Sequence, residues 1–552
     1  MQRYVLAGSA IVALALLGFF LFPGHTYLQS DTQIYIPMFE HLWNPAMLAS
    51  DIIAVRPHLS FTIYDEVSLG MRRLTGLDFE YVLQLQQVLW RISGLLGFFL
   101  IGRALKLSLP MSLLLTAIAG LGATIAGPAV LTFEYEPVPR GFAVPLLLLA
   151  IGLAAHQRHF WAGVAGSIAF LYHAPTTVPF WAIYFLVILW PSKPEVMRGR
   201  MAALPPLTAA VLLIFLLSRL QPGVTEPQVF LGRIDPELEA LQRLRAPYNW
   251  VSLWIGQWYS QYLFFLAVIA AAYFRLHSVI APAAKPFVLG LPLLGILSIP
   301  LSYLLLEKMK WILIPQYQPA RAVLFVTLFA VILSSAAAIH AAQKGIWWES
   351  FLWFTAAYAV PLNTRVLDLL WPDFSNATLL RRFTVMIVLA AIGVLAAWAD
   401  ARKRKWASAV LLLLCCAPFR AMPGYAHTVN FPALHTEALQ QLSQWARKET
   451  AKNSIFLFAD AARGLAPGIF RARAIRPVYV CWKAGGQVNY HKNVGEEWWE
   501  RWRQTMASKF DPTRIPEFAR LGIEYLVLKP EHRLPDRHAV FENKQFLVYR
   551  IR

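Results

Sequence analysis

The chain has 552 residues, of which 57% are hydrophobic and only 15% are charged, and its mean hydropathy is +0.49. Soluble domains average roughly 25% charged residues, so this composition excludes an ordinary soluble protein and indicates a membrane protein. The net charge of +19 favours basic loops beside anionic lipid over nucleic-acid binding, because most of the chain is apolar. Three cysteines, Cys415, Cys416 and Cys481, provide neither a disulfide framework nor a zinc-binding spacing.

The first element is the apolar stretch Tyr4–Phe22. It is long for the apolar region of a signal peptide, and the FPGHTY that follows offers no small-x-small cleavage site. We therefore interpret it as a retained transmembrane helix. Since a span needs about 20 apolar residues, and fewer inside a bundle, we predict about thirteen spans: 4–22, 84–102, 109–131, 141–156, 160–175, 178–190, 201–219, 251–274, 287–305, 322–341, 345–361, 383–399 and 406–418.

Charge divides the connections between these spans into two sets. If the N-terminus is cytoplasmic, the connections on that side are GRALKL, HQRH, SKPEVMRGR, RLHSVIAPAAK, AAQKG and DARKRK, nearly all basic. The opposite connections are longer and carry most of the acids; residues 23–82 alone hold seven acids against three arginines. This asymmetry follows the positive-inside rule. It predicts a bacterial inner-membrane protein with a cytoplasmic N-terminus and, because the number of spans is odd, a C-terminus outside.

The composition changes after Pro418. TEALQQLSQWARKE and EEWWERWRQTMASKF are typical of helices, whereas SIFLFA and AIRPVYVCW are typical of strands. PEFARLGIEYLVLKP reads as helix, turn and strand, and AVFENKQFLVYRI as two strands about a turn. We predict a mainly α fold: a polytopic membrane helix bundle over residues 1–420, and a periplasmic α/β domain over 421–552 that rests on anionic head groups.

The first outer loop, residues 23–82, is too long to be a simple connector. Its segment 31–43 places Ile34, Met38 and Leu42 on one helical face, so we expect an amphipathic helix lying flat on the outer membrane surface. Asp31 could cap this helix, or act as a general base towards an acceptor hydroxyl or amine. Glu40 and Asp51 follow in the same loop, either in a solvated or structural role or in the site.

A second outer loop, LTFEYEPVPRGF, contains Glu134, Glu136 and Arg140. Prolines at 137 and 139 end the helical pattern and favour an extended loop. Two carboxylates and a guanidinium so near hydrocarbon are costly unless they pair with each other or serve a function. A salt bridge between glutamate and arginine is therefore one interpretation, and a reactive site the other.

Further polar residues are predicted at the same side of the membrane. His173 in FLYHAPTTVPFW stands beside Pro175 at the outer end of a span, either in hydrogen-bonded packing or in a site. Gln318 and Arg321 in PQYQPARAV lie at the mouth of another span, where a guanidinium could bind phosphate in a bidentate manner or extend to the interface. Arg91, inside the second span, could line the same cavity.

Taken together, TYLQSDTQIY in a long loop after the first span, many spans and a terminal extracytoplasmic α/β domain resemble the GT-C superfamily of integral-membrane glycosyltransferases. This superfamily includes protein O-mannosyltransferases, aminoarabinose transferases of lipid A and oligosaccharyltransferase catalytic subunits. The resemblance implies that Asp31 assists attack on the anomeric carbon of a polyprenyl-phosphate sugar. The loop lacks the adjacent Asp-x-Asp or Asp-Glu pair, which leaves open whether a divalent metal ion takes part.

We therefore predict a glycosyltransferase that uses a polyprenyl-phosphate-linked donor and a glycan, lipid or protein acceptor at the periplasmic face. No Gly-rich phosphate loop or nucleic-acid module is present, so a cytosolic nucleotide sugar and nucleic acid are not expected partners. The alternatives are a lipid or polysaccharide transporter or flippase, and a non-catalytic scaffold. Convergence of the outer residues on one cavity would favour the enzyme. The predicted catalytic residues are Asp31, Glu134 and His173, and the predicted substrate-binding residues are Glu40, Asp51, Arg91, Glu136, Arg140, Gln318 and Arg321.

Overall fold

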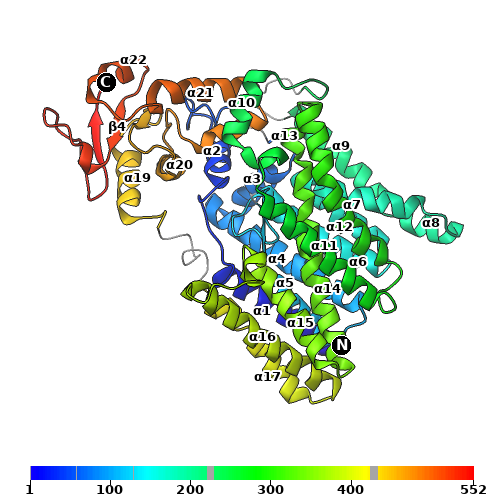
Figure 1. Ribbon diagram of the computed structural model, residues 1–552. Helices are drawn as coiled ribbons and strands as arrows, with labels where there is room; N and C mark the ends of the chain where they lie inside the picture. The colour runs from blue at the N-terminus through cyan, green and yellow to red at the C-terminus, as the bar shows by residue number, and fades with distance from the viewer. Residues whose placement is uncertain (1, 57–58, 129, 221–228, 423–432) are drawn as a thin grey trace.

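The computed structural model describes residues 2–56, 59–128, 130–220, 229–422 and 433–552. Most of the chain forms a bundle of apolar helices, and the C-terminal part forms a smaller α/β unit at one end of that bundle (Figure 1). The N-terminus lies towards the opposite end. The predicted fold class, a polytopic helical membrane protein with a C-terminal α/β part, is confirmed. The boundary at residue 420 stays a prediction, because residues 423–432 lie outside the described ranges.

Eight helical stretches of the described residues are long and apolar enough to cross a membrane. The helices of the bundle are α1 (Gln2–Phe20), α4 (Phe79–Ala104), α5 (Leu109–Gly120), α6 (Pro139–Ala155), α7 (His159–Leu189), α8 (Pro194–Met201), α9 (Leu204–Leu220), α11 (Gly256–Leu276), α12 (Lys285–Ser302), the π-helical turn η3 (Tyr303–Lys308), α14 (Val323–Gln343), α15 (Trp347–Leu362), α16 (Ala377–Ala401), α17 (Lys405–Cys415) and α18 (Pro418–Ala421).

Helix α7 is a hairpin and not one long rod. Its backbone leaves helical geometry at His173, with φ −158° and ψ 84°. Nδ1 of His159 lies 2.7 Å from the hydroxyl of Tyr184, although 25 residues of straight helix would separate them by roughly 37 Å. The two halves therefore run antiparallel, as the separate candidates 160–175 and 178–190 predicted. His173 stands at the apex.

With the α7 hairpin counted as two segments, a described helix lies at each of the thirteen predicted segments. Eight described helical stretches meet the length and hydropathy of a span, so the number thirteen stays a prediction. The prediction for 109–131 was too long, because α5 ends at Gly120 and is followed by two short antiparallel strands, β1 (Thr124–Ile125) and β2 (Val130–Leu131). Helices α4 and α6 pack most closely: a Cβ built on Gly97 would lie 2.3 Å from the backbone of Leu148. Small residues permit such backbone approach in membrane bundles.

The basic connections meet at one end of the bundle. The Ser108 hydroxyl donates to Asp400 at 2.7 Å, the Ala281 N–H donates to the carbonyl of Ala104, and ring nitrogens of His340 and His156 lie 3.0 and 2.9 Å from the carbonyls of Leu105 and Leu100. These contacts join the ends of α4, α6, α14 and α16. The acidic loops lie at the other end of the bundle. The basic and acidic connections are therefore separated in the fold, as predicted.

Shorter elements and the α/β unit occupy that other end (Figure 1). The loop elements are α2 (Thr32–Trp43), α3 (Tyr64–Thr75), α10 (Pro236–Arg245), η1 (Pro247–Asn249), η2 (Val251–Leu253), α13 (Ile314–Tyr317), η4 (Pro319–Ala322) and η5 (Val366–Leu369). The C-terminal elements are α19 (Glu437–Glu449), β3 (Phe456–Phe458), α20 (Ala466–Ala474), η6 (Lys483–Asn489), α21 (Lys492–Met506), η7 (Pro512–Arg514), α22 (Ile515–Arg520), β4 (Tyr525–Leu528), η8 (Pro530–His532), β5 (Phe541–Glu542) and β6 (Leu547–Arg550).

The C-terminal sheet has the order β3-β4-β6-β5, with β3 and β4 parallel and the other pairs antiparallel. The predicted helices and strands of this part are confirmed with one exception. The segment AIRPVYVCW forms only an isolated bridge between Val478 and Phe456, because the chain passes directly into η6. Through η6 this segment reaches the first outer loop.

Helix α2 does not lie on a membrane surface, contrary to the prediction. Every residue from Thr32 to Phe39 is buried, and α20 packs against the helix. The Arg471 guanidinium donates to the carbonyl of Gln33 at 2.8 Å, and Gly468 lies directly against the Gln33 side chain. The α/β unit therefore covers α2, and the apolar face of α2 belongs to the protein core.

Candidate active site

The Asp31 carboxylate is the centre of a cluster of charged groups. It accepts hydrogen bonds from Arg140 and from the Lys483 ammonium group, each at 2.7 Å. Asp31 occupies the N-cap position of α2, as predicted, yet its side chain accepts no bond from the helix N–H groups. Its carboxylate thus pairs with two cations and lines a cavity, and does not cap the helix.

Glu136 caps this helix in place of Asp31. The Glu136 carboxylate accepts from the backbone N–H groups of Ser30 (2.7 Å), Asp31 (2.9 Å) and Thr32 (3.3 Å), and from the Thr32 hydroxyl. A carboxylate at a helix start satisfies free N–H groups and is favoured by the helix dipole. Glu136 is 2% exposed and does not line the cavity. The structure gives it a capping role, and its role in substrate binding stays a prediction.

Arg140, the second residue of α6, joins two carboxylates. Its Nη1 donates to Asp31 and its Nε donates to Glu134 at 2.8 Å. The predicted salt bridge between glutamate and arginine is therefore formed, between Arg140 and Glu134. Glu134 also accepts from the N–H of Leu131. Its carboxylate is therefore held in place, and its bond to Nε of Arg140 fixes the guanidinium beside Asp31.

These contacts keep Asp31 ionised. Burial raises the pKa of its carboxyl, but the charges of Lys483 and Arg140 and their hydrogen bonds lower that pKa well below its ordinary value. The contribution of this cluster to stability is therefore fully present above the ordinary pKa of about 4, and it is lost only as pH falls through the lower pKa of the folded state.

A polar cavity of about 200 Å³ opens beside Asp31. Four cationic side chains, Arg140, Arg245, Arg321 and Lys483, line this cavity together with a single carboxylate, that of Asp31. Among the described residues, Arg245 and Arg321 have no carboxylate within ion-pair distance. Arg245 donates instead to the carbonyls of Trp482 and Lys483. The cavity therefore carries an excess of positive charge.

Several buried polar atoms around this cavity have no hydrogen-bond partner within the described part of the chain. They are all side-chain atoms: Oε1 of Gln318, Nε of Arg321, Nε2 and Oε1 of Gln487, and Oδ1 of Asn489. A buried polar group without a partner is costly. A cavity with this lining is suited to a polar, anionic ligand.

His173 also lines the cavity. The Thr176 N–H donates to its Nδ1 at 3.3 Å, and the Thr176 hydroxyl lies 2.8 Å from the same atom. The His173 side chain thus accepts a hydrogen bond at the start of the second half of the α7 hairpin, in agreement with the packing interpretation. Because Nδ1 is the acceptor, the proton of the neutral ring is on Nε2. Asp31, Arg140, His173 and Arg321 share one cavity, with Glu134 behind Arg140, which is the convergence expected of an enzyme.

Two apolar cavities adjoin the polar one. The first, about 240 Å³, shares Tyr35, His173 and Tyr490 with it and extends past Phe61, Phe215 and Phe230. The second, about 400 Å³, shares Gln318 and Arg321 with the polar cavity. Its other walls come from α7, α12 and α14 and include Val178, Leu294, Leu301 and Leu324. The site thus combines a cationic centre with apolar space among the spans.

Three other predicted substrate-binding residues lie outside this cavity. Glu40 pairs with Arg72 at 3.0 Å, and Asp51 lies 3.6 Å from Arg471 while accepting from the N–H groups of Ile53 and Ala54. Arg91 donates to the carbonyls of Gly18 at 2.7 Å, Gly24 and Glu134 at 3.1 Å. These contacts use the charged groups to join loops and spans, and contact of these residues with a substrate stays a prediction.

Sequence reasoning missed Lys483, Arg245, Gln487, Asn489 and Tyr490, which supply much of the cavity wall. Arg245 stands in RLRAPYNW, just before a span, as Arg321 does in QPARAV; that similarity was a usable signal. The segment CWKAGGQVNYHK has no comparable signal, because Lys483 reaches Asp31 only through the packing of the α/β unit on α2.

A half-buried histidine strengthens this packing. His435 lies 2.6 Å from the Tyr27 carbonyl through Nε2, and Arg473 donates to its Nδ1 at 3.0 Å. This arrangement needs a neutral ring, with Nε2–H donating and Nδ1 accepting. Burial, and then the charge of Arg473, lower the pKa of His435 to about 4.

We expect the contribution of His435 to be complete above its unfolded pKa of about 6.5, to weaken as pH falls through that value, and to be lost below about 4. The wild type should therefore lose more thermal stability between pH 7.5 and pH 5.0 than His435→Gln does. His538→Gln, at an exposed histidine of the same unit, should show the wild-type pH dependence. Identical pH dependence in the wild type and His435→Gln would contradict this assignment.

The side chains around the cavity are poorly suited to bind the divalent metal ion that the sequence left open. In the described ranges, no group of three or more His, Cys, Asp or Glu side chains could hold a metal ion. The one carboxylate that faces the cavity is already flanked by two cations, which oppose the binding of a third. We derive no reaction step through a metal.

Comparison with known proteins finds similar solved structures. No protein-family model matches the chain, and no curated protein matches it. Among solved structures, ArnT from Cupriavidus metallidurans bound to undecaprenyl phosphate matches 98% of this chain and 97% of its own, with 14% sequence identity and a TM-score of 0.48. The same protein in the apo state matches with the same values.

Proposed function

We propose that this protein is a membrane glycosyltransferase that moves a sugar from a polyprenyl-phosphate-linked donor to an acceptor hydroxyl or amine. One observation carries the proposal: a single ionised carboxylate, Asp31, faces a cavity lined by four cations and bordered by apolar space. An amphipathic donor with a phosphate between its sugar and its chain has the complementary chemistry.

The cations would bind the donor phosphate. Arg140 is already neutralised by Glu134, whereas Arg245 and Arg321 have no carboxylate partner among the described residues. Guanidinium groups match phosphate oxygens in a bidentate manner. We assign phosphate binding to Arg321, Arg245 and Lys483, and the isoprenoid chain to the 400 Å³ cavity, because Arg321 and Gln318 stand between that cavity and Asp31.

Asp31 would act on the acceptor. In the resting site, Lys483 and Arg140 neutralise its carboxylate. A bound phosphate competes for these cations, so the pKa of Asp31 rises towards its ordinary value and the carboxylate becomes a better base. The acceptor oxygen or nitrogen then attacks the anomeric carbon while its proton passes to Asp31. The bond from that carbon to the phosphate oxygen breaks, and its electron pair leaves with the polyprenyl phosphate.

The cations at the phosphate would assist this departure. Negative charge develops on the leaving oxygen as the bond breaks, and preorganised donors at that position stabilise the transition state. Arg321, in η4, and Lys483, in η6, both line the cavity and are suited to this role. The same groups hold the product until the polyprenyl phosphate leaves through the apolar cavity.

We further propose that the cavity and residues 421–552 face the periplasm of a bacterial inner membrane. The segregation of basic connections at the opposite end supports this orientation through the positive-inside rule. Reporter fusions after Arg552 should be active outside the cytoplasm. A reporter that is active only in the cytosol would reverse the orientation.

The function is tested with purified protein in lipid nanodiscs and a set of polyprenyl-phosphate sugars, each offered with candidate glycan, lipid and protein acceptors. We expect one donor to be consumed, with release of polyprenyl phosphate and an acceptor mass increased by one sugar residue. Movement of intact donor across the membrane of proteoliposomes, without release of polyprenyl phosphate, would instead identify a transporter and contradict the proposal.

A further inference from the structure

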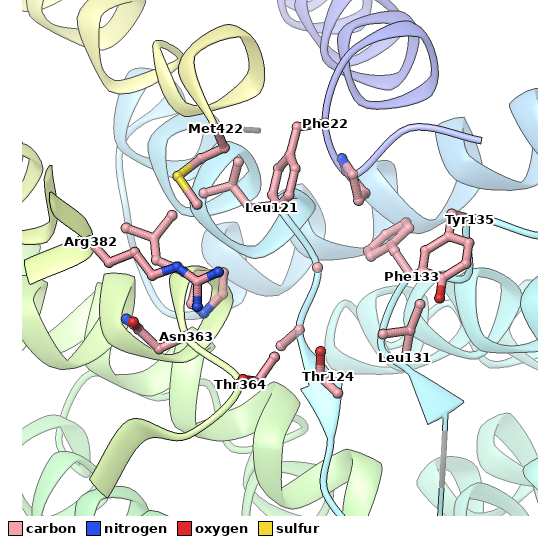
Figure 2. Close-up of a pocket in the computed structure, with 15 residues that line it drawn as sticks. Phe22, Leu121, Thr124, Leu131, Phe133, Tyr135, Asn363, Thr364, Arg382 and Met422 are labelled. Atoms are coloured by element: carbon pink, nitrogen blue, oxygen red, sulfur yellow. The ribbon is translucent and has the colours of Figure 1, made fainter. Parts of the chain in front are cut away.

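A separate cavity of about 410 Å³ lies at the same end of the bundle as the candidate active site. It is enclosed by the end of α1, the β1–β2 hairpin, the end of α15 and the start of α16 (Figure 2). None of its lining residues lines the polar cavity. Its volume is within the range of about 300–1,000 Å³ found for small-molecule sites.

A short strip of chain separates this cavity from the candidate active site. Phe133 and Tyr135 line the separate cavity, as Figure 2 shows. Glu134 and Glu136, which alternate with them, contact Arg140 and the start of α2 on the other side. Because Phe133 and Tyr135 face one cavity while Glu134 and Glu136 contact the site on the other side, the strip forms a shared wall.

The lining of the separate cavity is divided by polarity. Phe22, Leu121, Leu131 and Met422 give an apolar wall, whereas Asn363, Thr364 and Arg382 gather on one side (Figure 2). Arg382 makes no ion pair or hydrogen bond with any other described residue. A guanidinium beside an apolar cavity, without a carboxylate to neutralise it, is complementary to an anion that carries an apolar chain.

We propose that this cavity binds a second lipid whose head group is a phosphate. The phosphate lies against Arg382, Thr364 and Asn363, and the chain lies along Phe22, Leu121, Leu131 and Met422. This site is distinct from the one assigned to the sugar donor, and the inference does not rest on the proposed transfer reaction. A lipid in this cavity contacts the strip that holds Glu134 and Glu136. It therefore stands one residue away from Glu134, which pairs with Arg140, and from Glu136, which caps α2.

The test is photo-crosslinking of the purified full-length protein in nanodiscs with a phosphatidic acid that carries a diazirine in its acyl chain. We expect mass spectrometry to place the label on Leu121, Leu131 or Met422. In Arg382→Gln this labelling should fall about tenfold or more, because charge-assisted hydrogen bonds to the phosphate are lost. Arg381→Gln is the matched control, since Arg381 is the exposed neighbour on the same helix and does not line the cavity.

Two further measurements test whether the ligand must carry both a phosphate and an apolar chain. A diacylglycerol with the same photoreactive chain should label the cavity weakly, and inorganic phosphate should fail to displace the lipid. Arg321→Gln should retain the label, which separates this site from the donor site even if the proposed transfer reaction is wrong. Equal labelling of Arg382→Gln and Arg381→Gln, with both variants as thermally stable as the wild type, would overturn the proposal. Equal labelling by the neutral probe, or displacement by inorganic phosphate, would overturn it as well.

Discussion

Replacing Asp31 with asparagine should lower the turnover of sugar transfer by about 10²–10⁴-fold, the range that a positioned general base contributes. Asp31→Asn retains the shape of the side chain but cannot accept the acceptor's proton at neutral pH. The substitution also removes the one negative charge that faces the cavity. We therefore expect the KM for the donor to stay constant or fall while kcat falls.

A fall in kcat without a rise in KM distinguishes a loss of catalysis from a loss of folded protein. Arg140 retains Glu134 as a partner in the variant, so the bundle should keep its thermal stability within a few degrees. The control is Glu40→Gln, which removes an acid of the same helix that pairs with Arg72 outside the cavity; its transfer rate should match that of the wild type. Wild-type turnover in Asp31→Asn, measured by product mass, would remove Asp31 from the reaction.

Replacing Lys483 with glutamine should reduce kcat/KM for the donor by about 10²-fold or more. The ammonium group reaches across from the α/β unit to Asp31 and to the Ser30 hydroxyl, at 2.7 and 2.8 Å. Its loss removes a cation from the proposed phosphate site, and a hydrogen bond to a charged group is worth about 1.5–3 kcal/mol. Initial rates over a range of donor concentrations should show an increased KM.

The pH profile gives a second readout for Lys483. Because the charge of Lys483 lowers the pKa of Asp31, Lys483→Gln should raise that pKa, and the acidic decline in activity should begin at a higher pH than in the wild type. Lys492→Gln is the control, since Lys492 pairs with Asp235 at 2.6 Å at the same interface but outside the cavity. Equal losses of kcat/KM in both lysine variants would show that Lys483 acts only as an interface residue.

The apolar helices and the separation of basic from acidic connections could be predicted because hydrocarbon imposes them locally. A run of apolar residues can be recognised without knowledge of its neighbours, and the basic connections each carry their own charge. Even the reversal at His173 was visible as two apolar runs on either side of HAP. Asp31, Arg140 and Arg321 were identified because polar groups stand out beside long apolar runs.

The rest of the site depends on contacts between distant segments. Glu136 caps a helix more than a hundred residues earlier in the chain, which frees Asp31 from the capping role that local sequence favours. Lys483 is 452 residues from Asp31 in sequence, and only the docking of the α/β unit on α2 brings them together. Glu40 and Asp51 could not be assigned to an ion pair from the sequence, because the arginines that neutralise them are not their sequence neighbours.

The most direct test of the central claim is a structure, by electron cryomicroscopy, of the purified protein with bound polyprenyl phosphate. The account predicts phosphate density between Arg321, Arg245 and Lys483, with the isoprenoid chain entering the cavity lined by Leu294, Leu301 and Leu324. It also predicts that Lys483 turns from Asp31 towards the phosphate. Phosphate bound elsewhere on the molecule, with the Asp31 cavity unchanged, would contradict the account.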